Sequence, residues 1–333
     1  MSEKRIEANK LKYHTSWTAN SLSWSTYGSN PFRLAVSSYI QDYKNFVDII
    51  EKDENDQLVC SASWEHCYPP TKTMFPPQQM NNDYIITTAD YLRLWEVTET
   101  ASKSGETRGN GKRVSLKHVF DSGKPNDFCS PVTSCDWNQY NVNIVGCCSI
   151  DTTVTIWDIE SNQQKTKLVA HDKDVYDMAF ASAETFSSCG ADGSVRLFDL
   201  RSMDHSTILY ESAGLTPLLR ISYNQKDPHY FAVFGIESTE VVVLDDRYPS
   251  VPVSVLSGRH TGPLNGMAWS PLSARNICTV GEDAIVCIWD TDSSHSMYNF
   301  QGDSPINNVV WNNPNQENWI GVTTKEGVQL LMY

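Results

Sequence analysis

Short strand-like segments of this chain end in the same way, on an aromatic residue followed by Asp. Three of them are VTIWDIE at residues 154–160, VRLFDLR at 195–201 and VCIWDTD at 286–292. Each combines β-branched residues with an aromatic, a composition that favours a pleated, half-buried strand. A segment that recurs in this way at a regular interval is typical of a repeat architecture, in which each copy is one structural unit.

Weaker copies of the segment give the interval. The aromatic, or an apolar residue in its place, recurs at seven marker positions: Ile50, Trp95, Trp157, Phe198, Leu244, Trp289 and Leu331. Successive markers lie 45, 62, 41, 46, 45 and 42 residues apart. All but one of these steps match a four-stranded propeller blade, which takes about 40–45 residues. The spacing therefore predicts seven repeats with one insertion.

A second set of positions keeps the same phase. An upstream aromatic precedes six of the markers by 20, 20, 18, 21, 20 and 20 residues; these aromatics are Phe75, Trp137, Phe180, Tyr223, Trp269 and Trp311. In the first repeat the spacing from Trp24 to Ile50 is looser, at 26 residues. The turns before the markers carry Asp or Gly, as in SIDTT, GADGS and GEDAI, which suits antiparallel strands joined by tight turns. Each repeat is therefore predicted to hold a constant module of three strands and a more variable segment.

These patterns predict an all-β protein with a single seven-bladed propeller over residues 10–333, preceded by a flexible N-terminus at 1–9. The last repeat ends at Tyr333 without an outer strand, whereas residues 10–17 precede the first repeat. We therefore expect the N-terminal strand to close the ring, which removes an exposed sheet edge.

The one stretched step indicates an insertion at residues 100–126, between blades 2 and 3. It carries six basic residues among Gly and Ser: Lys103, Arg108, Lys112, Arg113, Lys117 and Lys124. Two interpretations stay open for it, a solvated loop or a dedicated docking site.

Composition limits the classes of protein to which the chain can belong. Its net charge of −14 argues against direct binding of nucleic acid, and no apolar run reaches the roughly 18 residues of a membrane span. The N-terminal residues MSEKRIEANK lack the apolar core of a secretion signal. Nine Cys without a Cys-x-x-Cys pair indicate reduced thiols, so we expect the protein in the cytoplasm and nucleus.

A polar set keeps the repeat spacing in the sixth repeat: His260, Thr279, Asp283 and Trp289. Their donors and acceptors can satisfy one another without water, because indole donates, a hydroxyl does both, imidazole bridges and a carboxylate accepts. The fourth repeat has a similar set, His171, Ser188 and Asp192, but its marker Phe198 has no donor. A set that repeats with the blade is predicted to be a structural tetrad and not an active site.

Longer runs of the chain resemble one branch of the WD40-repeat proteins. They are DFCSPVTSCDWN at 127–138, AHDKDVYDMAF at 170–180, GADGSVRLFDLR with HSTILYE at 190–211, and KDPHYFA at 226–232. The family is that of the plant TRANSPARENT TESTA GLABRA and light-regulated WD proteins, with the animal anthocyanin-regulator homologues, also classed as cullin-ligase-associated factors. The resemblance implies a non-enzymatic scaffold for proteins: bHLH and MYB transcription regulators in plants, DYRK-type and homeodomain-interacting kinases in animals.

Two consecutive repeats end in Asp-x-Arg, with Asp199 and Arg201 in one and Asp245 and Arg247 in the next. They resemble the WDxR box by which WD40 substrate receptors dock on the adaptor of cullin-4 ubiquitin ligases. An Arg placed just after a strand can present its planar fork to a carboxylate of a partner. The same pair can instead stabilise the turn of its own blade, and the sequence leaves both possibilities open.

Signatures of an enzyme are absent from the sequence. It contains no Gly-x-Gly-x-x-Gly, phosphate-loop, His-Glu-x-x-His or Gly-x-Ser-x-Gly motif, and its eight His are dispersed. We therefore predict no catalytic residue, no cofactor, no metal site and a monomeric propeller that works within complexes. The expected docking surface is the loops at one face, together with residues 63–80, a Pro- and aromatic-rich stretch that either docks a peptide or packs on its own blade.

Overall fold

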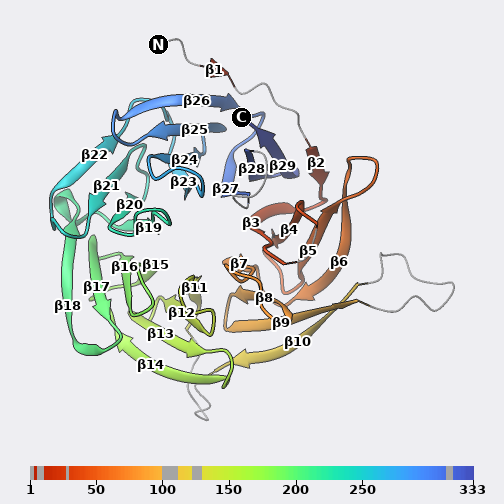
Figure 1. The fold of residues 1–333 in the computed structure, drawn as a ribbon, viewed down its shortest axis with the longest axis horizontal. Helices are drawn as coiled ribbons and strands as arrows, with labels where there is room; N and C mark the ends of the chain where they lie inside the picture. The colour runs from red at the N-terminus through yellow and green to blue at the C-terminus, as the bar shows by residue number, and fades with distance from the viewer. Residues whose placement is uncertain (1–3, 6–10, 28–29, 100–111, 122–129, 313–317) are drawn as a thin grey trace.

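A computed structural model describes residues 4–5, 11–27, 30–99, 112–121, 130–312 and 318–333. Its strands form seven sheets arranged in a ring (Figure 1). The predicted all-β, seven-bladed propeller is confirmed. Within the described residues, no helix has the length and apolar character needed to span a membrane.

The blades follow one another along the chain. Blade 1 contains β3 (Thr18–Trp24), β4 (Arg33–Tyr39), β5 (Asn45–Lys52) and β6 (Leu58–His66). Blade 2 contains β7 (Lys72–Met74), β8 (Asp83–Thr88), β9 (Leu92–Glu99) and β10 (Lys112–Phe120). Blade 3 contains β11 (Val132–Trp137), β12 (Ile144–Ser149), β13 (Thr153–Asp158) and β14 (Gln163–Val169). Blade 4 contains β15 (Val175–Phe180), β16 (Thr185–Gly190), β17 (Ser194–Asp199) and β18 (Ser202–Glu211).

A 3₁₀ turn (Ala213–Leu215) links blade 4 to blade 5. Blade 5 contains β19 (Leu218–Tyr223), β20 (Tyr230–Gly235), β21 (Val241–Asp245) and β22 (Pro252–Leu256). Blade 6 contains β23 (Leu264–Trp269), β24 (Asn276–Gly281), β25 (Ile285–Asp290) and β26 (His295–Gln301). Blade 7 contains β27 (Ile306–Trp311), β28 (Trp319–Thr324) and β29 (Gly327–Met332), and β2 (Leu11–His14) is its outer strand.

The seven marker residues lie on the third strand of each blade, and none is more than 9% exposed. The upstream aromatics lie at or just after the end of the inner strands. The looser spacing in blade 1 comes from the connection between β3 and β4, which starts at Ser25 and ends at Phe32. Part of this connection is anchored, because Trp24 Nε1–H donates to Pro31 O at 2.8 Å.

The N-terminal strand closes the ring, as expected. Strand β2 pairs antiparallel with β29, placing Leu11 opposite Leu330 and Tyr13 opposite Val328 (Figure 1). The Tyr13 hydroxyl also donates to Asp48 Oδ2 of blade 1 at 2.8 Å. Gly327 is required at this junction: its φ is +128°, and a Cβ there would lie 2.0 Å from Tyr13 O.

Two expectations about the chain's irregular segments need correction. Lys4–Arg5, within the segment expected to be flexible, forms β1 and pairs in parallel with β26, whose outer edge is otherwise open. Lys112–Phe120, within the predicted insertion, is β10, the outer strand of blade 2. The long spacing between the markers Trp95 and Trp157 therefore includes a strand of blade 2. The sequence pattern covered only the first three strands of each blade, so it could not locate this fourth strand. The rest of residues 1–9 and of residues 100–126, Asp121 apart, lies outside the described residues.

Residues 63–80 run from the end of blade 1 into blade 2. They include the end of β6 and all of β7, and Phe75 is only 3% exposed. Trp64 packs against Trp95 of blade 2 with ring centroids 5.5 Å apart. Of the two interpretations, packing on the blades describes this stretch, although Tyr68 at its turn is 40% exposed.

The apolar core lies between the blades. The described residues form seven clusters, each shared by two adjacent blades. For example, Val286 and Ile288 of blade 6 pack with Ile306 and Val309 of blade 7. Each blade therefore packs against both of its neighbours, and we expect closure of the ring to contribute to its stability.

Candidate interaction sites

One chain of hydrogen bonds joins the four side chains of the predicted tetrad in blade 6. Trp289 Nε1–H donates to Thr279 Oγ1 at 2.8 Å, and the same hydroxyl lies 2.8 Å from His260 Nε2. His260 Nδ1 lies 3.1 Å from Asp283 Oδ2. Since indole only donates and the carboxylate only accepts, Thr279 donates to Nε2 and His260 donates to Asp283. Burial lowers the pKa of His260 although Asp283 opposes this, so the ring is neutral at pH 7.

Blade 4 holds a shorter version of this network. His171 Nε2 lies 2.8 Å from Ser188 Oγ, and His171 Nδ1 lies 3.0 Å from Asp192. The marker Phe198 instead stacks on Phe186, with centroids 5.1 Å apart and planes 15° apart. An aromatic stack therefore replaces the indole hydrogen bond in this blade.

A third network, which the sequence patterns missed, joins His66 at the end of β6 in blade 1 to Thr87 and Trp95 of blade 2. Trp95 Nε1–H donates to Thr87 Oγ1 at 2.9 Å, and His66 Nε2 lies 3.1 Å from the same hydroxyl. The carbonyl of Tyr68, 2.7 Å from His66 Nδ1, takes the place of the Asp. Burial lowers the pKa of His66 to about 4. The set was missed because Thr87 precedes its Trp by 8 residues, whereas Thr279 precedes Trp289 by 10.

Replacing His260 with Ala is expected to lower the free energy of unfolding by about 1–3 kcal/mol, because Thr279 and Asp283 each lose a buried partner. Urea unfolding followed by fluorescence measures the change. His295→Ala, at an exposed position of β26, is the matched control and should stay close to the parent. Partner affinity of the folded fraction should not change; normal stability with lost binding would instead assign the tetrad a role in recognition.

The two Asp-x-Arg pairs lie at the ends of β17 and β21. Arg201 Nη2 donates to Asp199 Oδ2 at 2.6 Å, and Arg247 Nη2 donates to Asp245 Oδ2 at 2.6 Å. The hydrogen bond from Arg201 lowers the pKa of Asp199 to about 2. The Arg side chains remain 66% and 47% exposed. Each Asp therefore orients its Arg, and a large part of each Arg side chain stays open to solvent.

Both pairs lie on one face of the ring. In every blade the first and third strands run in the same direction because neighbouring strands are antiparallel. The face at which these strands end is here called the exit face, and it carries Arg201 on blade 4 and Arg247 on blade 5.

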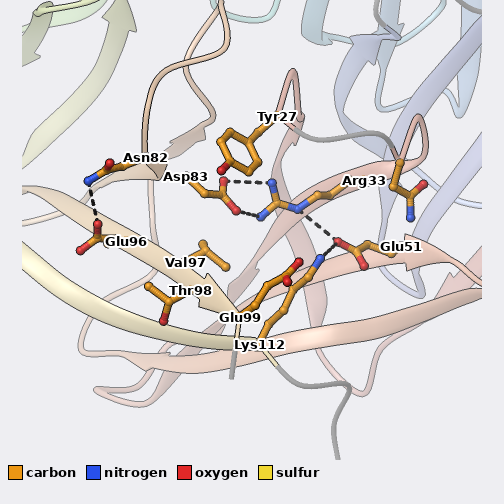
Figure 2. A pocket seen from close by; sticks show the side chains of 11 residues that line it. Tyr27, Arg33, Glu51, Asn82, Asp83, Glu96, Val97, Thr98, Glu99 and Lys112 are labelled. Carbon is orange, nitrogen blue, oxygen red and sulfur yellow. Dashed lines mark hydrogen bonds and ion pairs between the residues drawn. The ribbon is translucent and has the colours of Figure 1, made fainter. Parts of the chain in front are cut away.

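A charged cleft of about 510 Å³ lies on the same face between blades 1 and 2. Figure 2 shows Arg33 at its centre: Nη1 and Nη2 donate to Asp83 at 3.0 and 2.6 Å. Arg33 Nε lies 3.2 Å from Glu51, which also pairs with Lys112. Arg33 is only 2% exposed. Because Arg33 and Glu51 belong to blade 1 whereas Asp83 and Lys112 belong to blade 2, this network joins the two blades.

A second cavity, of about 470 Å³, lies in the central channel. Lys72 of β7 lines it, with Nζ 3.7 Å from Asp177 Oδ1 of β15. Burial alone would lower the pKa of Lys72, but Asp177 and the nearby Asp136 raise it, so the amine is charged at pH 7. Asp136 Oδ2 in turn accepts from the Phe180 N–H at 2.8 Å, and burial raises the pKa of Asp136 to about 6.

The sequence patterns did not identify Lys72, Asp136 and Asp177 as polar residues of the channel. A register signal was available: Lys72, Asp177 and Arg220 each lie three residues before the aromatic that closes their inner strand. This register did not show that Lys72 and Asp177 lie close together, because they are far apart in sequence. Only the closed ring brings their strands together around the channel.

Metal-binding geometry is not found in the described part of the chain, which holds no cluster of three or more His, Cys, Asp or Glu suited to an ion. The eight Cys that the structure describes are all free thiols. Cys129 lies outside the described residues.

Known proteins resemble this chain both locally and over its full length. The family described as WD domain, G-beta repeat, matches residues 122–158, 162–199 and 250–290. A DDB1- and CUL4-associated factor 7 homolog from Dictyostelium discoideum is 41% identical over 340 residues, covering 99% of this chain and 99% of its own length.

Two fungal proteins also match most of the chain. A WD repeat-containing protein of Saccharomyces cerevisiae is 32% identical, covering 89% of this chain and 60% of its own length. An uncharacterized WD repeat-containing protein of Schizosaccharomyces pombe is 34% identical, covering 87% of this chain and 73% of its own length. These matches confirm the resemblance drawn from the sequence runs: the chain belongs to the WD40-repeat family of the DDB1- and CUL4-associated factor 7 homologues.

Proposed function

We propose that this protein is a non-enzymatic scaffold that assembles kinases, transcription regulators or both, acting as a monomeric propeller in the cytoplasm and nucleus. The observation that carries the proposal is that buried polar side chains of the propeller form hydrogen bonds with other groups of the protein. These groups form hydrogen bonds inside three separate clusters. The clusters are the tetrad of blade 6, the network of His66, Thr87 and Trp95, and the group around Arg33. Polar groups committed in this way stabilise a rigid ring whose loops are left to bind partners.

A second candidate function is that of a substrate receptor for a cullin-4 ubiquitin ligase. It is favoured by the placement of Arg201 and Arg247, exposed on one face of consecutive blades. The name of the Dictyostelium relative, a DDB1- and CUL4-associated factor 7 homolog, supports the same candidate. The two functions are compatible, because a scaffold can hold its clients on other loops while the exit face docks on an adaptor.

Affinity purification from the native organism tests both candidates. Kinases or transcription regulators among the captured proteins are expected for the scaffold, and their absence would contradict it. The double variant Arg201→Glu/Arg247→Glu should lose at least tenfold of the captured adaptor, since each reversal places a carboxylate beside Asp199 or Asp245. Arg275→Glu is the control, at an exposed Arg that also pairs with an Asp, on blade 6. Full retention of the adaptor by the double variant would exclude docking through these pairs.

A further inference from the structure

The channel cavity combines one fixed charge with neutral walls. Among the described residues that line it, Lys72 carries the only charge. Its volume of about 470 Å³ falls within the range of about 300–1,000 Å³ that is usual for binding pockets. Its lining extends to loops that follow inner strands, such as Pro77 after β7 and Gln225 after β19. The cavity therefore lies toward the exit face of the ring.

Lys72 lines this cavity, whereas the nearby Asp177 accepts hydrogen bonds from backbone N–H groups of the strands. Asp177 Oδ2 accepts from the Ile221 N–H at 3.2 Å and Oδ1 accepts from the Met178 N–H at 3.0 Å, and its side chain is 3% exposed. The Lys72 side chain is 30% exposed, and its 3.7 Å separation from Asp177 exceeds a hydrogen-bond distance. Lys72 is thus paired with Asp177 at a distance longer than a hydrogen bond, and part of its side chain is open to the channel.

The channel wall is layered. Ser21 and Asn308 line the cavity and lie three residues before their strand-ending aromatics, as Lys72 does. This level is polar. Met74, Ala268 and Val310 lie one residue before the aromatics, closer to the exit face, and this level combines them with Ser23 and Ser222. A side chain entering from the exit face would pass this level, here called the collar, and then reach the level of Lys72.

We infer that the channel accepts a single acidic side chain, Glu or Asp, from an extended segment of a partner protein that enters at the exit face. The methylene stem packs against Met74, Ala268 and Val310 of the collar, and the carboxylate forms a charge-assisted hydrogen bond with Lys72. The net charge of −14 repels a strongly acidic chain, so the rest of the segment is neutral or basic. This site is separate from the Asp-x-Arg pairs, and its test does not depend on the cullin adaptor.

The direct test uses the full chain with ¹³C-methyl-labelled Met, because Met74 and Met267 both line the cavity. The probes are the blocked tripeptides acetyl-Gly-Glu-Gly-amide and acetyl-Gly-Gln-Gly-amide at millimolar concentration, the range expected for so small a ligand. The Glu peptide is expected to shift both methyl signals in a saturable way, and the Gln peptide to shift them at least fivefold less. Equal shifts from both peptides, or none from either, would overturn the inference. Equal saturable shifts from sodium acetate alone would also overturn it, by assigning the site to small carboxylates.

Four variants locate the effect. Lys72→Met should abolish the shifts, whereas Lys165→Met, at a Lys 52% exposed on the outer strand of blade 3, should retain them. If Lys72→Met does not fold, Lys72→Arg and Ala268→Leu carry the test: the first keeps the cation and should bind, and the second narrows the collar and should weaken binding at least tenfold. Binding that persists in a folded Lys72→Met or Ala268→Leu variant would place the peptide elsewhere and contradict the inference.

Discussion

Replacing Arg33 with Ala is expected to lower the free energy of unfolding by about 3–5 kcal/mol, the largest effect of any single substitution considered for this protein. The guanidinium is 2% exposed and is held by two bonds to Asp83 and by Glu51. Without it, two carboxylates remain in a partly buried cleft with Lys112 as their remaining partner in the network (Figure 2). The packing of Arg33 over the Phe75 ring, at 4.9 Å, is lost as well. Urea denaturation measures the difference.

Two further variants distinguish the two possible causes of this effect, uncompensated buried charge and lost packing. Arg275→Ala removes an Arg that is 69% exposed and paired with Asp292, and it should cost less than about 1 kcal/mol. Arg33→Met/Asp83→Leu removes both charges of the bidentate pair and should recover much of the loss, since an apolar replacement of a buried ion pair is often tolerated. If the double variant is no more stable than Arg33→Ala, lost packing and not uncompensated charge is the cause.

Deleting residues 1–18 is expected to abolish cooperative unfolding. The deletion removes β2, leaving β29 as an open sheet edge, and takes away Leu11 and Tyr13, which pack on the cluster that joins blades 7 and 1. It also removes the hydrogen bond from Tyr13 to Asp48. Because each blade is stabilised by its two neighbours, opening the ring at one point weakens the whole structure. A broad thermal transition by circular dichroism or calorimetry is the expected result.

Deleting residues 1–9 is the matched control. It removes β1, which makes only two residue pairs with β26, and leaves β2 in place. This shorter deletion should melt sharply and close to the full chain. A sharp transition in the chain without residues 1–18 would show that the ring is stable without its N-terminal strand.

The repeat markers were predictable because blade strands are local and periodic. Residues such as Trp157 and Trp289 combine an aromatic with β-branched neighbours and an Asp turn, and all of these signals lie within a few residues of each other. The tetrad of His260, Thr279, Asp283 and Trp289 could be assembled for the same reason, since its members fall within one repeat. The outer strand β10 was not recognised, because outer strands are more exposed and their sequence is less constrained.

The sequence by itself determined the number of blades, the closure by the N-terminus, the tetrad of blade 6 and the family. Only the tertiary structure decided which residues of different blades meet: Arg33 with Asp83, Lys72 with Asp177, and the exposed Arg201 and Arg247 on one face. The physical reason lies in the range of the interactions. Strand periodicity and turn chemistry act over a few residues, whereas these pairs are 46 to 105 residues apart in sequence and come together only when seven blades pack into a closed ring.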